Sequence, residues 1–154
     1  MGRIVGRMIE VSESVTVDAP VERVFAFMDD PKNHLTVTPS LADVRNVERL
    51  DSGGKRLDHT FRMAGITLDG ELEEVERTED ERMLFAMRGQ LSGEIELTFE
   101  PTDGGTRLTY TGRYDLPGEV LGRVARPFVR RYNERELSTT LANVKTHVET
   151  DSTA

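Results

Sequence analysis

DAPVERVFAFMDDP, residues 18–31, decides the fold of this chain, because it predicts a short helix between one strand and a long series of further strands. Pro20 stands where the helix begins, since its fixed φ suits a first turn and its missing N–H is not needed there. One helical face is apolar and consists of Val21, Val24, Phe25 and Met28. Asp29-Asp30-Pro31 ends the helix, and we expect the polar residues of the stretch to be caps and solvent contacts.

The residues before this helix alternate in the manner of a half-buried strand. The apolar row consists of Ile9, Val11, Val15 and Val17. Glu13 is the one residue that interrupts it. A strand that begins near residue 13 would leave the Glu13 carboxylate in water, whereas an earlier start would bury it and require a partner such as His59 or an arginine, or else a protonated carboxyl.

The remainder of the chain predicts a second short helix or turn, six strands and a long final helix. Residues 31–41 form the short element, and residues 127–148 carry the final helix. Turn signals separate six stretches with the pattern of antiparallel strands, namely 44–50, 56–63, 66–77, 82–88, 91–100 and 106–115. Together these elements predict an α+β arrangement with a sheet layer and a helix layer.

The final helical segment changes its apolar face at Pro127. The apolar residues before and around this proline share one face, namely Leu121, Val124, Ala125, Phe128 and Tyr132. The later ones lie almost opposite, namely Leu137, Leu141, Val144 and Val148. Because a proline inside a helix removes a hydrogen bond and bends or breaks the helix, the sequence predicts either a kink or two separate helices.

Length and composition favour one acidic domain without cysteine. For 154 residues we expect a single domain over 1–154, with an ordered core over about residues 8–149. The absence of Cys excludes disulfides, thiolate catalysis and Cys-ligated zinc. A net charge of −8 argues against nucleic-acid binding, which depends on neutralising phosphates. No apolar run is long enough for a membrane span or a signal peptide, so we expect a cytoplasmic protein.

Lysine is scarce among the 20 basic residues, which include only Lys32, Lys55 and Lys145. An acidic, lysine-poor surface is typical of a high-salt cytoplasm, where dense ions screen like charges. A GC-rich genome that favours arginine codons would produce the same bias. On the halophilic interpretation, we expect molar KCl to stabilise the folded state.

Three segments of the chain together resemble one known superfamily. They are SVTVDAPVERVFAFMDDPKNH (14–34), DGGTRLTY (103–110) and LPGEVLGRVARPFVRRYNERELSTTLANVKTHVE (116–149). The chain resembles the START-like (SRPBCC) superfamily, in its polyketide cyclase/dehydrase-like or coenzyme-Q-binding-like branch. The resemblance implies a helix-grip fold, in which a curved seven-stranded antiparallel sheet surrounds a long C-terminal helix and encloses an apolar cavity. Val37 stands where relatives often carry Trp, so an aromatic wall at the cavity mouth is not expected.

Strand parity supplies candidates for the lining of such a cavity. Three inward rows contain a glycine, which either leaves room for a ligand or marks a bend in the sheet. The inward rows and the neighbouring helix faces provide the following candidates: Phe27, His59, Phe61, Met63, Leu68, Gly70, Phe85, Met87, Ile95, Leu97, Tyr110, Gly112, Tyr114, Phe128 and Asn133. Met and Phe side chains suit an adaptable apolar site.

His59 and Glu13 are the candidates for acid–base chemistry. His59 is the one histidine on an inward row, and its ordinary pKa lies near neutrality; it is either a catalytic acid or base or a wall residue that orients a ligand. We expect His34 and His147 on the surface. The three histidines lack metal-ligand spacing, so we expect no metal site and no cofactor.

Arg123, Arg126 and Arg130 form a basic stripe before and into the final helix. A basic amphipathic segment either contacts anionic lipid or an acidic head group, or is solvated and paired with glutamate. The sequence carries no indication of the oligomeric state.

The leading hypothesis for function is a non-enzymatic module that binds or transports a hydrophobic small molecule, such as a lipid, a quinone or a polyketide-like compound. Burial of apolar ligand surface would supply the affinity. The first alternative is a cyclase, aromatase or dehydratase in which His59, Glu13 or a tyrosine moves protons. The second alternative is an interaction protein with a collapsed cavity.

Overall fold

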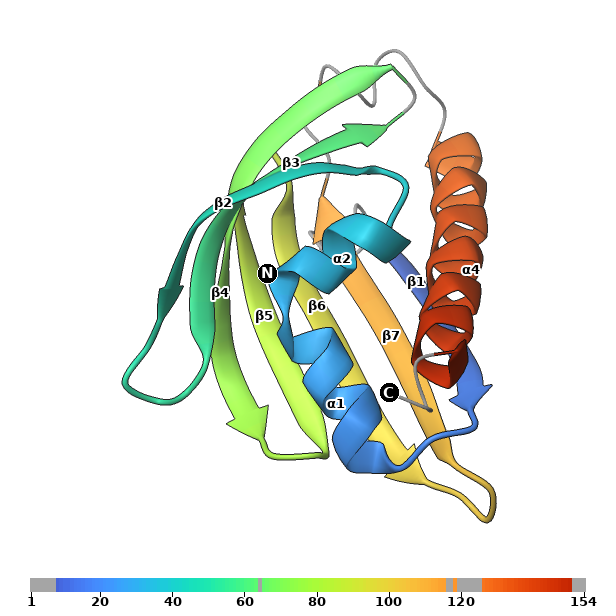
Figure 1. Cartoon of the computed structure of the whole chain (residues 1–154). Coiled ribbons are helices and arrows are strands. Elements are labelled where there is room, and N and C mark those ends of the chain that lie inside the picture. The colour runs from blue at the N-terminus through green and yellow to red at the C-terminus, as the bar shows by residue number, and fades with distance from the viewer. Residues whose placement is uncertain (1–7, 64, 116–117, 119–125, 151–154) are drawn as a thin grey trace.

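Seven antiparallel strands form one curved sheet in the computed structural model of the chain, which describes residues 8–63, 65–115, 118 and 126–150 (Figure 1). Neighbours in the sheet follow the order β1-β7-β6-β5-β4-β3-β2, so that β1 and β2 are its edges. The strands are β1 (Ile9–Val17), β2 (Leu41–Arg49), β3 (Lys55–Met63), β4 (Ile66–Thr78), β5 (Arg82–Gly89), β6 (Ser92–Pro101) and β7 (Thr106–Asp115). The predicted α+β helix-grip fold is confirmed.

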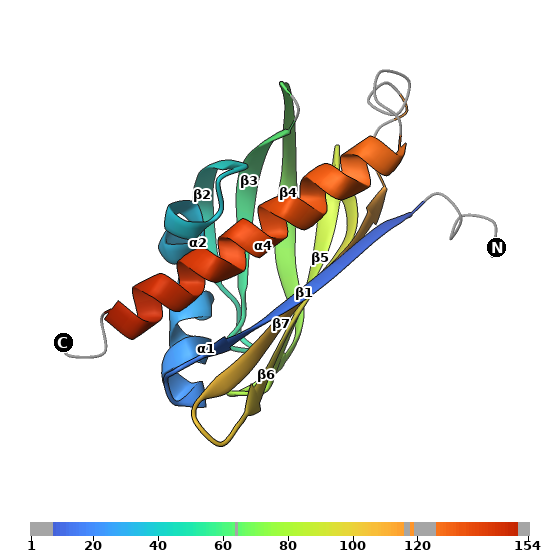
Figure 2. The ribbon, with the colours of Figure 1, turned by 90° about the vertical axis from the view of Figure 1, so that its right-hand side faces the viewer.

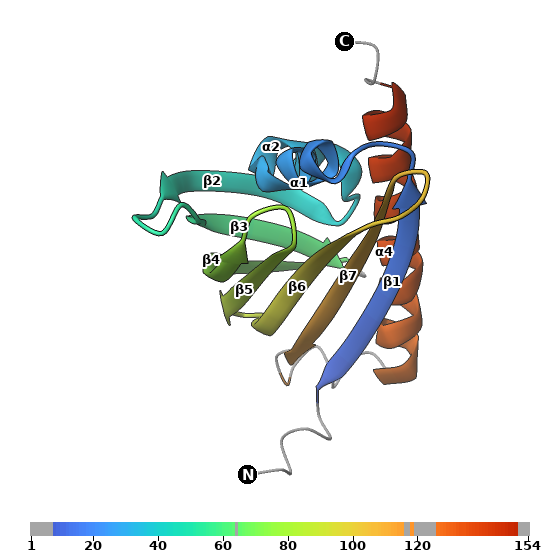
Figure 3. The ribbon, with the colours of Figure 1, turned by 90° about the horizontal axis from the view of Figure 1, so that it is seen from below.

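The helices of the described ranges are α1 (Val21–Asp29), α2 (Pro31–Val37) and α4 (Arg126–Thr150). Helix α4 packs along β1, and α2 contacts both β2 and α4. The Asn143 side chain of α4 donates a hydrogen bond to the carbonyl of Val37 at the end of α2 (2.9 Å). Figure 2 shows α4 running along the sheet on the side of β1, and Figure 3 shows α1 and α2 across the open side of the curve. The helices therefore close the concave face of the sheet.

The strand boundaries agree with the sequence pattern except at the edge strand β2. This strand begins at Leu41, which pairs with Phe61, instead of near residue 44. Its register shifts between Leu41 and Asp43 and again between Arg45 and Glu48. These irregularities interrupt the alternation from which a strand is identified in sequence.

The local signals around α1 act as expected. Pro20 precedes the helix with φ −63°, and its carbonyl accepts hydrogen bonds from the amides of Arg23 and Val24. The apolar face of α1 packs into the core through Val24, Phe25 and Met28. Asp30 then caps α2, since its side chain accepts a hydrogen bond from the amide of Lys32 at 3.0 Å.

Pro127 is the second residue of α4, which the structure describes from Arg126 onward. Residues 119–125, directly before this helix, lie outside the described ranges. Beyond Pro127, the buried stripe of α4 comprises Leu137, Leu141, Val144 and Val148. Leu121, Val124 and Ala125 of the predicted earlier face lie outside the described residues.

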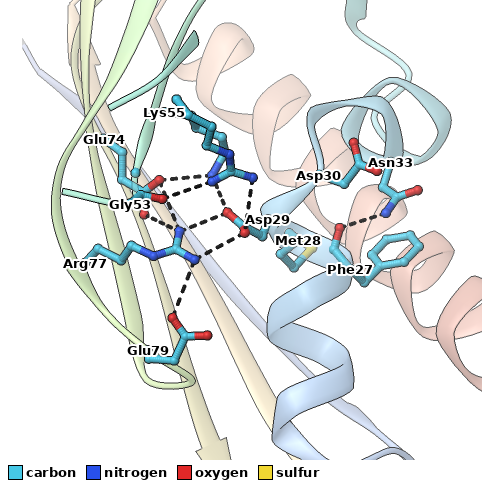
Figure 4. Close-up of polar contacts among 12 residues, drawn as sticks. Phe27, Met28, Asp29, Asp30, Asn33, Gly53, Lys55, Glu74, Arg77 and Glu79 are labelled. Carbon is cyan, nitrogen blue, oxygen red and sulfur yellow. Dashed lines mark hydrogen bonds and ion pairs between the residues drawn. The ribbon is translucent and has the colours of Figure 1, made fainter. Parts of the chain in front are cut away.

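Four charged side chains join the end of α1 to strands β3 and β4 (Figure 4). The Asp29 carboxylate accepts hydrogen bonds from Lys55 Nζ (2.8 Å) and from Arg77 Nη1 and Nη2 (2.9 and 3.2 Å). The Glu74 carboxylate accepts from Lys55 Nζ (3.0 Å) and Arg77 Nη1 (3.1 Å). We refer to Asp29, Lys55, Glu74 and Arg77 as the ionic cluster.

The ionic cluster is largely buried, although the side chains of Asp29 and Arg77 are 19% and 15% exposed, and the exposed Arg49 adds a third cation 3.4 Å from Asp29. Lys55 is 2% exposed and Glu74 is 3% exposed. Burial raises the pKa of Asp29, but the hydrogen bonds and charges of Arg77 and Lys55 outweigh it and hold that pKa well below its usual range. The two cations also lie over aromatic rings, with Lys55 Nζ 4.9 Å from the ring centre of Phe85. The expectation of caps and solvent contacts is thus wrong for Asp29 and confirmed for Asp30.

Replacement of Asp29 by Asn is expected to lower the free energy of unfolding by about 1.5–3 kcal/mol, because it removes charge-assisted hydrogen bonds and leaves Lys55 and Arg77 facing one carboxylate. Urea denaturation at pH 7 measures this change. The matched control is Glu79→Gln: Glu79 lies 3.6 Å from the same Arg77, but its side chain is 72% exposed. Its loss should cost less than about 0.5 kcal/mol. Equal effects of the two substitutions would contradict a structural role for the cluster.

Candidate functional site

Two adjoining cavities lie under the concave face of the sheet. The first has a volume of about 80 Å³ and is lined by Val11, Thr38, Ser40, Phe61, Met63, Met87, Leu91, Ile95, Tyr110, Gly112, Tyr114, Asn133, Glu136, Leu137 and Thr140. The second has a volume of about 50 Å³ and is lined by Pro31, His34, Thr38, Leu41, Val44, Lys55, Leu57, His59, Phe61, Leu72, Phe85, Ile95, Leu97 and Tyr110. The walls share Thr38, Phe61, Ile95 and Tyr110.

The size of these cavities suits a small ligand. A single water needs about 10–15 Å³ on the same measure, so cavities of 80 and 50 Å³ each have space for several waters. Most of the lining side chains are apolar. Both cavities are lined by Phe61, so they adjoin at this residue.

His59 is the unusual residue of the second cavity. It lies on the inward row of β3, between Leu57 and Phe61, and it is 1% exposed. Its ring meets that of Phe61 edge-on, with 4.9 Å between the ring centres. Neither ring nitrogen, Nδ1 or Nε2, has a hydrogen-bond partner among the described residues. Buried polar atoms are rarely left unpaired in native proteins, and those that are call for an explanation.

Burial makes His59 a neutral imidazole. The pKa of this residue is lowered to about 4, mainly by burial and also by the positive charge of Arg45, while Asp58 and Asp69 act in the opposite direction. A neutral imidazole carries one N–H donor and one acceptor nitrogen. His59, which lines the second cavity, therefore has one donor and one acceptor without a partner in the described part of the chain.

Two other polar groups of the second cavity, Lys55 and His34, already have partners. Lys55 belongs to the ionic cluster, and Nε2 of His34 lies 2.6 Å from the carbonyl oxygen of Met28. Burial lowers the pKa of His34. The prediction of a surface position is thus wrong for His34, which α2 turns against the end of α1. It is confirmed for His147, which is exposed.

Polar groups gather at one end of the first cavity. The Asn133 amide of α4 donates a hydrogen bond to the hydroxyl of Tyr114 on β7. Glu136, one turn further along α4, lines the same cavity, and burial raises the pKa of its carboxyl. Burial also raises the pKa of Tyr110 to about 12, so its hydroxyl stays protonated near neutral pH.

The inward glycines differ in what they do. A Cβ on Gly93 would lie 2.0 Å from the carbonyl oxygen of Arg113, and one on Gly70 would lie 2.6 Å from that of Arg88. These two glycines permit close approach of neighbouring strands. A Cβ on Gly112 would meet side chains only at an ordinary 3.8 Å, and Gly112 lines the first cavity. Gly112 therefore leaves space at a cavity wall, whereas Gly70 and Gly93 allow close approach of neighbouring strands.

The structure places most of the predicted lining residues on the cavity walls, namely His59, Phe61, Met63, Phe85, Met87, Ile95, Leu97, Tyr110, Gly112, Tyr114 and Asn133. Leu68 lies in the core, and Gly70 lies beside the ring of His59. Phe27 stacks on His147, 6.3 Å between ring centres. Phe128 is 57% exposed at the start of α4, away from both walls.

Sequence reasoning missed Lys55 and Glu136 on these walls. Lys55 has the parity of Leu57 and His59, so an extension of the inward row by one step would have found it. Glu136 precedes Leu137 of the α4 stripe by one residue, and no pattern distinguishes it from a solvated glutamate.

Glu13 does not join His59. Strand β1 runs from Ile9, so Glu13 lies in its middle, opposite Tyr110, and it is partly exposed. Of the two alternatives considered from sequence, the structure therefore has the earlier start of the strand, yet the Glu13 side chain is not fully buried. Four strands separate β1 from β3, and no hydrogen bond links Glu13 to His59 in the described ranges. The catalytic pairing considered from sequence has no geometric support.

The predicted arginine stripe is described only in part. Arg123 lies outside the described residues, Arg126 begins α4, and Arg130 is exposed with its Nε 3.6 Å from Glu134. None of the helices that the structure describes is long and apolar enough to span a membrane. No group of three or more His, Asp or Glu side chains within those same ranges is placed to hold a metal ion.

Comparisons with known proteins agree with this architecture. A family model described as "Polyketide cyclase / dehydrase and lipid transport" matches residues 8–149. A protein from Thermus thermophilus has a similar structure, with 22% identity, a TM-score of 0.81 and coverage of 93% of this chain and 99% of that one. The Zhui aromatase/cyclase from a Streptomyces species has 17% identity, a TM-score of 0.75 and coverage of 92% and 94%.

A START superfamily protein from Mycobacterium smegmatis is similar to the same degree, with 17% identity, a TM-score of 0.75 and coverage of 92% and 97%. At these identities the likeness concerns the fold. A search of the curated proteins finds no match to the sequence.

The buried His59 makes the protein sensitive to acid. Its pKa falls from 6.5 to about 4 on folding, so below pH 6.5 the unfolded chain binds a proton that the folded protein does not. Stability is then lost as the pH falls from 6.5 to 4, by about 3 kcal/mol in total.

We expect His59→Leu to abolish this component. The difference in unfolding free energy between variant and wild type should be constant above about pH 7. Between about pH 7 and about pH 4 the wild type should lose about 3 kcal/mol of stability relative to the variant. Chemical denaturation across this pH range measures it, with the exposed His147→Gln as control. If the unfolding free energies of wild type and His59→Leu changed in parallel with pH, His59 would not be held neutral in the folded protein.

Proposed function

The chain belongs to the polyketide cyclase/dehydrase and lipid transport family, whose model covers residues 8–149, and we propose that it binds a hydrophobic small molecule in the two adjoining cavities. The ligand is a compact apolar molecule of the lipid, quinone or polyketide-like kind. Affinity comes from burial of its apolar surface, and His59 orients it.

The observation that carries this proposal is the pair of unpaired nitrogens on His59. Leaving buried polar groups without partners costs about 1–3 kcal/mol each, and a core position filled by Leu or Phe would avoid that cost. A histidine that faces a cavity with both nitrogens free is explained by a ligand that supplies the missing hydrogen bond. The apolar character of the surrounding walls then defines the rest of the ligand.

A second candidate function is catalysis of a cyclase, aromatase or dehydratase type. The family description and the polar end of the first cavity, at Tyr114, Asn133 and Glu136, favour it. The proton-transfer groups are poorly matched to it, because a general acid or base works best with a pKa near the working pH. His59, with a pKa of about 4, is a weak base, and Tyr110, with a pKa of about 12, is a weak acid. Binding is the better-supported function.

The cavities also argue against the remaining alternative, an interaction protein with a collapsed cavity. The cavities of 80 and 50 Å³ argue against a collapsed interior. Gly112 supports the same view, because a larger residue would fit its backbone and fill the first cavity.

Naphthalene is a suitable probe of the binding function, because it is apolar and has two rings. The chain has no Trp, so the fluorescence of naphthalene can be followed directly in the presence of the protein. We expect saturable binding with one site per chain. Gly112→Val should weaken binding at least about tenfold, since its side chain occupies the first cavity without straining the backbone.

The matched control is Gly104→Val, in the exposed turn between β6 and β7, where an added Cβ would meet nothing within 4 Å. It should bind naphthalene as wild type does. Absence of saturable binding to the wild-type protein, or equal affinity of the Gly112 and Gly104 variants, would overturn the proposed function.

A further inference from the structure

The charges around the two cavities restrict the ligand more narrowly than their apolar character does. Lys55 is the one cationic side chain on either wall, within the ranges that the structure describes. A cavity that receives a carboxylate or a phosphate needs a cation or several free donors to replace the water lost from the anion. Whether the cavities can bind an anion therefore depends on whether the positive charge of Lys55 is free to interact with a ligand.

The Lys55 ammonium is already occupied. An ammonium has three N–H donors, and two of them meet the carboxylates of Asp29 and Glu74 at 2.8 and 3.0 Å. On a further side lies the ring of Phe85, with its centre 4.9 Å from Nζ. Lys55 thus closes the wall of the second cavity without offering its charge to the interior.

The remaining polar groups supply no positive charge either. Nε2 of His34 is engaged by the carbonyl of Met28. In the first cavity the titratable groups are Tyr110, Tyr114 and Glu136, none of which becomes a cation. The neutral hydrogen-bonding groups that remain are His59 and the hydroxyls of Thr38 and Tyr110. Of these, His59 has two buried atoms without a partner within the described residues, and in its neutral form it presents one donor and one acceptor.

We infer, resting on the binding function proposed above, that this cavity selects electrically neutral apolar molecules that carry a hydroxyl or carbonyl oxygen, which hydrogen-bonds to His59, and that it rejects carboxylates of the same size. A phenol or alcohol can donate to one imidazole nitrogen, and a ketone can accept from the other. A carboxylate would be buried beside Glu136 or an uncharged histidine, with no counter-charge.

Three ligands of matched shape test this inference: naphthalene, 2-naphthol and 2-naphthoate, each titrated at about pH 7.5. The wild-type protein should bind 2-naphthol about tenfold more tightly than naphthalene, as expected for one hydrogen bond to an otherwise unpaired buried group. It should bind 2-naphthoate at least about tenfold more weakly than naphthalene. In His59→Leu the ratio of the dissociation constants of naphthalene and 2-naphthol, both measured on that variant, should fall to about one.

The outcomes separate this inference from the function on which it rests. Binding of 2-naphthoate as tightly as 2-naphthol to the wild type would overturn the inference alone, and this comparison needs no variant to fold. Persistence of the 2-naphthol advantage in His59→Leu would also overturn it. If none of the three ligands bound the wild-type protein, the proposed function would fail, and this inference with it.

Discussion

The carboxylate of Asp29 and its two cations constrain both the architecture and the site of this protein. Asp29 ends α1, and its partners Lys55 and Arg77 lie on β3 and β4. This contact fixes the position where the chain turns from α1 into α2, and α2 in turn covers the sheet between β2 and α4. Pro31 and His34 of α2 line the second cavity. Lys55 also forms part of a cavity wall, so the same interaction removes its charge from the interior.

His59 shows how the sheet and the ionic cluster combine in one site. Strand β3 carries Lys55, Leu57, His59 and Phe61 on its inward row, so the neutral histidine follows the neutralised lysine by four residues. Gly70, opposite His59 on β4, leaves room for the imidazole ring, 3.3 Å from where its own Cβ would lie. The result is a polar but uncharged point in an apolar wall. Such a point orients a ligand at low cost in desolvation, which a charged group would not.

Much of the fold could be predicted from sequence, because its signals are local. The Pro20 start, the Asp30 cap and the alternation of the strands each depend on residues within one element. The inward rows likewise identified most of the cavity wall, since strand parity fixes the side to which a residue points. Strand parity could not predict the ion-pair partner of each charged side chain that points inward. Lys55 and Glu74 extend adjacent inward rows, but their pairing with Asp29 depends on how α1 docks.

The most direct test of this account is the ¹⁵N spectrum of the His59 side chain, recorded across pH and then with 2-naphthol. The account predicts that one ring nitrogen stays protonated and the other bare from about pH 8 to about pH 5, with titration near pH 4. Saturation with 2-naphthol should then shift a ring nitrogen of His59 and leave His147 unchanged. Titration of His59 near its ordinary pKa of 6.5, or a spectrum unaffected by bound 2-naphthol, would contradict a neutral, unpaired histidine that meets the ligand.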